Sequence, residues 1–69
     1  MKKTDDFLVE ENELELFKDV CKRLPSIDFK SYGDGRAYIE YTYANSLYYL
    51  GSIFARELTA KRWRNITAI

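Results

Sequence analysis

Hydrophobic and polar residues recur with two different periods along this 69-residue chain, and the two periods predict helices and a hairpin. Between Asn12 and Pro25 the apolar residues lie mostly three positions apart, which is the spacing of one face of an amphipathic helix. That face consists of Leu14, Phe17, Val20, Cys21 and Leu24. We expect Asn12 to cap this helix and Pro25 to end it, because the residue before a proline disfavours helical dihedral angles.

A two-residue alternation of apolar and polar side chains follows in residues 27–32 and 36–43, and it predicts a β-hairpin. Gly33-Asp34-Gly35 lies between the two runs and supplies residues that tolerate the positive φ angles of a tight turn. In the second run, the side chains expected on the buried face are those of Ala37, Ile39, Tyr41 and Tyr43. The opposite face is expected to carry Arg36, Tyr38, Glu40 and Thr42.

A second helix is predicted after Asn45, which we interpret as its N-cap. Its buried stripe is expected to be Leu47, Leu50, Phe54 and Leu58. Gly51 lies beside this stripe, and a glycine inside a helix costs about 1 kcal/mol relative to alanine. Close packing against the sheet or against a second subunit would explain it. Residues 6–10 and 64–69 are expected to form terminal strands, with a lead-in to the first helix as the other interpretation of 6–10.

The predicted order of strand, helix, strand, strand, helix and strand indicates one α+β domain over residues 1–69. Right-handed crossovers then give a ferredoxin-like βαββαβ arrangement, with both helices on one face of a small antiparallel sheet. If the terminal strands do not form, an αββα unit with a two-stranded hairpin remains. The two helices of the ferredoxin-like arrangement run antiparallel, which places the acidic start of the first beside the basic end of the second. A basic docking patch over residues 61–64 is the alternative interpretation of this charge asymmetry.

The composition offers little catalytic chemistry. The chain has no histidine and one cysteine, so it lacks the commonest general base and cannot form an internal disulfide or a structural zinc site. Cys21 lies on the predicted buried stripe, where a free cysteine is usually a core residue. We therefore predict a non-enzyme without metal or cofactor. No apolar segment is long enough to span a membrane, and the free thiol without a secretion signal predicts a cytoplasmic protein.

Tyrosine is concentrated in one part of the chain, because five of the six tyrosines fall between Tyr38 and Tyr49. So many rings cannot all be buried in a domain of this size, and tyrosine suits a wet contact surface because its ring is apolar and its tip polar. The formal net charge is zero, which argues against a protein held on nucleic acid by phosphate contacts. The prediction is a self-associating protein–protein interaction module, a type that includes inhibitors and regulators. Its expected partner-binding residues are Tyr32, Tyr38, Tyr48, Tyr49 and Trp63.

The stretch Gly35-Arg36-Ala37-Tyr38-Ile39-Glu40-Tyr41 resembles the RNP1 segment of the RNA-recognition motif, although Asp34 and Arg36 depart from its pattern. Phe7-Leu8-Val9 occupies the place of that family's second motif, with Leu8 at the exposed position. The resemblance implies an alternative function in which Tyr38 stacks on a base of single-stranded RNA. Lys30 and Arg36 would lie beside it as RNA-binding residues, with Tyr32 as a neighbour. A good hairpin strand would show the same pattern without any RNA.

Overall fold

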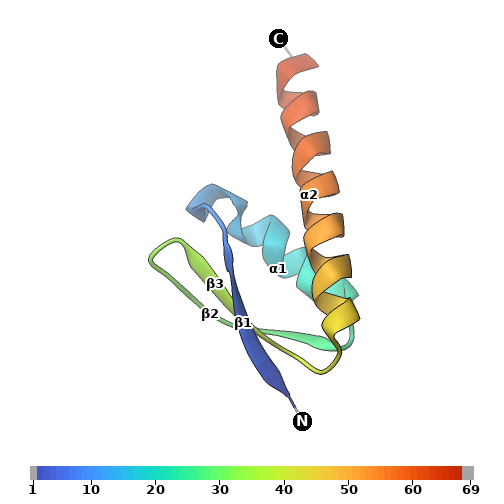
Figure 1. The fold of residues 1–69 in the computed structure, drawn as a ribbon. Helices are drawn as coiled ribbons and strands as arrows, with labels where there is room; N and C mark the ends of the chain where they lie inside the picture. The colour runs from blue at the N-terminus through green and yellow to red at the C-terminus, as the bar shows by residue number, and fades with distance from the viewer. Residues whose placement is uncertain (1, 68–69) are drawn as a thin grey trace.

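The structure is a computed structural model that describes residues 2–67 and, among them, the side chains of residues 2–63. Its elements are strand β1 (Lys3–Leu8), the 3-10 turn η1 (Glu11–Glu13), helix α1 (Leu14–Arg23), strands β2 (Ile27–Gly33) and β3 (Arg36–Tyr41), and helix α2 (Ala44–Thr67). Three strands form one sheet and two helices accompany it in the described residues, which confirms the predicted α+β class. Figure 1 shows how these elements are arranged.

The sheet has the strand order β1-β3-β2, and both neighbouring pairs are antiparallel. Strand β3 therefore lies in the middle, with β1 and β2 as the two edges. Asp34 and Gly35 connect β2 to β3 with φ angles of 54° and 74°. Both residues are in the left-handed region that a tight two-residue hairpin turn requires, so the predicted turn is confirmed.

The hydrophobic core lies between one face of the sheet and the two helices. Its fully buried side chains include Phe17 of α1, Ile39 of β3 and Leu50 of α2. The Phe17 ring meets the Phe54 ring edge to face, with 5.1 Å between the ring centroids. Ala37 and Ile39 are completely buried, whereas Tyr38 between them is 42% exposed. The predicted division of β3 into a buried and an open face is therefore confirmed for these residues.

The two helices approach each other in an antiparallel sense. At the start of α1, Glu13 Oε2 lies 3.3 Å from Arg62 Nη2 of α2. At the opposite end, the hydroxyl groups of Ser26 and Ser46 form a hydrogen bond. The acidic start of α1 therefore lies beside the basic part of α2, as the sequence predicts.

The C-terminal strand predicted over residues 64–69 is wrong for residues 64–67, which continue α2. Neither glycine nor proline, the residues that end helices most strongly, follows Gly51 in the sequence. The last two predicted residues, Ala68 and Ile69, lie outside the described residues. The four-stranded βαββαβ arrangement is therefore absent from residues 2–67. The αββα alternative is wrong as well, because β1 pairs with β3.

Two predicted helix caps are also wrong. Asn12 lies inside η1, and the N-cap residue of α1 is Glu13, whose side chain makes no capping hydrogen bond. Glu13 N–H instead donates to Glu10 O at 2.8 Å, so a 3-10 turn takes the place of a side-chain cap. Asn45 is the second residue of α2.

Helix α2 gives the molecule an elongated shape. Its 24 residues correspond to about 36 Å of helix, and the structure measures 47 × 24 × 15 Å. The Cα radius of gyration is 12.6 Å, against about 11 Å expected for a compact domain of this length. Figure 1 shows the last turns of α2 extending beyond the sheet and α1.

Candidate interaction surfaces

The face of the sheet that the helices leave uncovered has Tyr38 at its centre and ion pairs around it. Arg36 Nη1 lies 2.6 Å from Asp6 Oδ2 on β1. Lys30 Nζ lies 3.3 Å from Glu40 Oε1 on β3. Both basic residues that the RNA hypothesis assigns to this face are therefore neutralised by carboxylates of the same chain.

A third ion pair lies further along the same face, between Lys2 Nζ and Asp28 Oδ2 at 3.0 Å. The hydrogen bond from Lys2, together with its positive charge, lowers the pKa of the Asp28 carboxyl. In the same way, the hydrogen bond to Asp6 raises the pKa of Arg36. On the open face, three basic side chains are thus paired with three carboxylates around the Tyr38 ring.

Tyr32 does not lie on this open face, so its predicted place beside Tyr38 is wrong. The register of β2 shifts between Phe29 and Ser31, which leaves Lys30 as an extra residue. Such a bulge reverses the side-chain alternation of every residue after it. Tyr32 pairs with Ala37, packs against the core, and donates a hydrogen bond from its hydroxyl to Val9 O at 2.7 Å.

The exposed aromatic side chains of α2 form a second surface. Tyr48 is 73% exposed and Tyr49 56%, and their rings meet edge to face at 5.9 Å. Trp63 is 62% exposed, fifteen positions further along the helix. Positions 48, 52, 55, 59 and 63 follow a spacing of three or four, so they share one side of α2. Three of the predicted partner-binding residues are therefore on one exposed helix, whereas Tyr38 is on the sheet.

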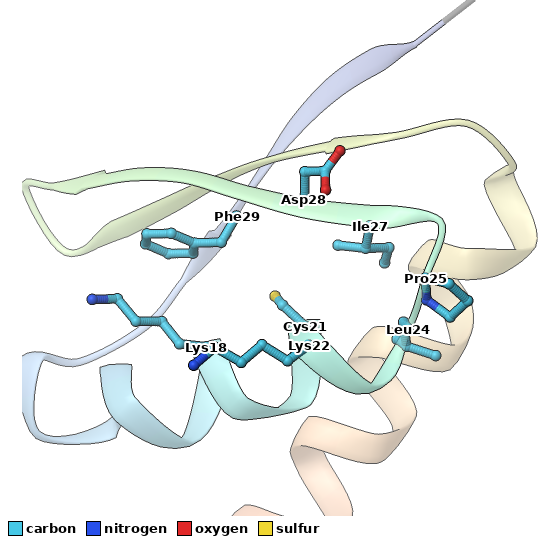
Figure 2. Close-up of a pocket in the computed structure, with 8 residues that line it drawn as sticks. All are labelled: Lys18, Cys21, Lys22, Leu24, Pro25, Ile27, Asp28 and Phe29. Atoms are coloured by element: carbon cyan, nitrogen blue, oxygen red, sulfur yellow. The ribbon is translucent and has the colours of Figure 1, made fainter.

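A pocket of about 520 Å³ lies between α1 and β2. Figure 2 shows the Cys21 thiol and the Phe29 ring pointing into this space, and the Asp28 carboxylate pointing away from it. The pocket is lined by Lys18, Cys21, Lys22, Leu24, Pro25, Ile27, Asp28 and Phe29. The floor is apolar, and Lys18 Nζ lies 5.3 Å from the centroid of the Phe29 ring, in cation–π geometry.

The predicted basic patch over residues 61–64 is only partly available. Arg62 is paired with Glu13, and Lys61 lines a smaller pocket of about 160 Å³ with Leu58 and the residues before α1. The side chain of residue 64 lies outside the described part of the structure. For Arg62, this ion pair supports the interpretation in which the basic end of the second helix lies beside the acidic start of the first.

Cys21 is 2% exposed, and burial raises the pKa of its thiol to about 11. A thiol with such a pKa is protonated at neutral pH and is a poor nucleophile. Among the described residues, no group of three or more side chains of the metal-binding types is positioned to hold a metal ion.

The sequence analysis did not identify the pocket between α1 and β2. The one sequence signal for it was the pair Lys18 and Lys22, which are one helical turn apart and flank the apolar stripe of α1. Their position over β2 depends on how α1 packs on the sheet, and periodicity alone does not specify that packing.

Comparisons with protein-family models, with curated proteins and with solved structures find no match for this chain. Within residues 2–67, neither helix combines the length and the apolar character that crossing a membrane requires.

Proposed function

We propose that this chain is a non-enzymatic protein-binding module that self-associates through the exposed side of α2. The observation that carries the proposal is the exposure of Tyr48, Tyr49 and Trp63 on one helix that extends beyond the body of the domain. Tyrosine and tryptophan supply much of the binding energy in protein interfaces. A role as an inhibitor or regulator in the cytoplasm is consistent with a small module that has a free thiol.

The pattern on α2 suits a second copy of the same chain. Tyr48 and Trp63 mark the two ends of the exposed side, about 22 Å apart along the helix axis. The positions between them hold the small residues Ser52, Ala55 and Thr59, which allow another helix to approach closely. In an antiparallel pair of α2 helices, Tyr48 of each copy would meet Trp63 of the other.

Such a pairing is self-complementary, as a two-fold symmetric interface must be. The Thr59 hydroxyl already donates to Ala55 O at 2.9 Å, so it can enter an interface without losing a partner. The chain also has surface to bury: its accessible area is 5125 Å², against about 4,500 Å² for a compact monomer of 8.2 kDa. The difference of about 600 Å² is about three quarters of the roughly 800 Å² that each partner contributes to a standard interface.

Sedimentation equilibrium of the full chain up to high micromolar concentration tests this proposal. We expect a dimer whose dissociation constant rises at least about tenfold in Tyr48→Ala, because the symmetric dimer loses two aromatic anchors and each truncation costs about 1 kcal/mol or more. Tyr43→Ala is the matched control, since Tyr43 is 67% exposed but precedes α2. A wild-type chain that stays monomeric throughout this range would refute self-association.

Binding of single-stranded RNA to the open face of the sheet is the second candidate. The observation that favours it is the exposed Tyr38 ring on the central strand, within the RNP1-like stretch. The ion pairs of Arg36 and Lys30 argue against it, because phosphate would have to displace Asp6 and Glu40. In a fluorescence titration with a mixed-sequence oligonucleotide, Tyr38→Ala should cost about 1–3 kcal/mol if a base stacks there. Absence of binding in low salt would eliminate this function.

A further inference from the structure

The pocket between α1 and β2 lies beside the first residues of β2, which is an edge strand of the sheet. Three consecutive residues of β2, residues 27–29, line it. Successive side chains of a strand point to opposite faces, and the Asp28 carboxylate points away from the pocket in Figure 2. The backbone of β2 itself therefore borders the pocket at Asp28.

Part of this edge is available for backbone hydrogen bonds. Ile27 N–H donates to Leu24 O at 3.1 Å, so it does not pair with β3. Peptide groups of a strand alternate between its two edges, so the N–H and C=O of Phe29 point to the same outer edge as Ile27 N–H. Among the described residues, no strand pairs with this edge. A peptide segment can therefore add to β2 before the bulge at Lys30.

The rim of the pocket carries positive charge that the rest of the described chain does not neutralise. Lys18 and Lys22 are one turn apart on α1, and like charges at this spacing repel each other. Neither lysine forms an ion pair with a carboxylate within residues 2–63, whereas Lys2 and Lys30 each have one. An acidic group between Lys18 and Lys22 would relieve this repulsion.

We infer that the outer edge of β2 and the adjoining pocket bind an extended peptide segment that carries both acidic and apolar side chains. The backbone of the peptide pairs with Phe29, in the manner of strand addition. An apolar side chain enters the pocket between Cys21, Ile27 and Phe29, and a neighbouring carboxylate reaches Lys18 or Lys22. The volume of about 520 Å³ accommodates one or two aliphatic side chains.

This inference rests on the proposed function only in that both make the chain a protein-binding module. The pocket and the exposed side of α2 have no residue in common. Peptide binding can therefore be measured on Tyr48→Ala, in which the proposed dimer is weakened. The two proposals can fail independently of each other.

The probe is an acetylated and amidated octapeptide of alternating glutamate pairs and valine pairs, so that each face of the extended strand carries both kinds of side chain. Titration into the isotope-labelled full chain, followed by amide NMR shifts, should move Ile27, Asp28 and Phe29 most strongly. We expect Lys18→Glu with Lys22→Glu to raise the dissociation constant about tenfold or more, since two attractions become repulsions. The matched control, Lys3→Glu with Lys61→Glu, has the same net charge and should stay within about twofold of wild type.

Two further peptides decide between this binding mode and other contacts. Replacement of glutamate by lysine should abolish binding, and N-methylation of the valines should abolish it too, because it removes the backbone donors. The inference would be overturned if either of these peptides bound as tightly as the original octapeptide. It would also be overturned by amide shifts confined to α2 or to the Tyr38 face, or by the absence of binding at millimolar peptide. Should the double variant not fold, Lys22→Glu alone serves the same test, since Lys22 is exposed.

Discussion

The Tyr32 hydroxyl donates a 2.7 Å hydrogen bond to the backbone oxygen of Val9 and so joins the hairpin to the segment that follows β1. Val9 is 2% exposed, and its N–H donates to Gly35 O at 3.0 Å. Both polar backbone groups of Val9 are therefore satisfied by the hairpin. This link closes the sheet at the end where β1 leaves it for α1.

Tyr32→Phe removes the hydroxyl and leaves Val9 O without this donor. We expect the free energy of unfolding in urea to fall by about 1 kcal/mol, the usual net value of such a hydrogen bond. Tyr43→Phe, at an exposed position outside the strands, should leave it unchanged. Equal stability of the Tyr32 variant and wild type would show that water replaces the hydroxyl at no cost.

Gly51→Ala should stabilise the chain by about 1 kcal/mol, because alanine is the better helix former. A Cβ at this position would meet Phe7 Cε2 at 3.9 Å, which is an ordinary van der Waals contact. Packing within one copy therefore does not require the glycine. Thermal or urea unfolding measures the change. A clear loss of stability that grows with protein concentration would instead show that a second subunit packs against Gly51.

The buried Cys21 thiol should react slowly with a disulfide reagent in the folded chain and rapidly in denaturant. Its pKa is raised from an ordinary value of 9.0 to about 11, so the folded state keeps the proton over this interval. The resulting stabilisation is complete below about pH 9 and is lost as pH rises toward 11. The free energy of unfolding should decline less steeply over this interval in Cys21→Ala. If the free energy of unfolding declined equally steeply in wild type and in Cys21→Ala, the Cys21 thiol would not be the group responsible.

The Asp28 carboxyl should titrate below its ordinary pKa of 3.8, because the ammonium of Lys2 holds it in the charged form. The contribution of this ion pair is present above that ordinary value and is lost as pH falls through the lowered pKa. In Lys2→Ala the pKa of Asp28 should rise toward 3.8. Carboxyl NMR titration measures it, and Lys3→Ala is the control that should leave it unchanged.

Much of the secondary structure follows from local pattern. The turn at Asp34 and Gly35 was predictable because few residues tolerate positive φ. The buried stripe of α1 and the division of β3 into a face with Ile39 and a face with Tyr38 follow from periods of 3.6 and 2. The caps were not predictable from residue type alone, since a 3-10 turn at Glu11–Glu13 replaces the expected cap at Asn12.

Among the candidate site residues, exposure of Tyr38, Tyr48, Tyr49 and Trp63 could be anticipated because a small core cannot enclose so many rings. Tyr32 could not be placed, because a single extra residue at Lys30 moves its side chain to the other face. No feature of the local sequence specifies whether that residue is absorbed as a bulge or carried through the strand.

The sequence by itself determined the elements, because helix, turn and strand preferences depend on neighbours a few positions apart. Only the tertiary structure decided the final place of Tyr32 and the packing of Lys18 and Lys22 beside the edge of β2. Each of these depends on contacts between segments distant in sequence, whose energies are settled by packing the whole chain at once.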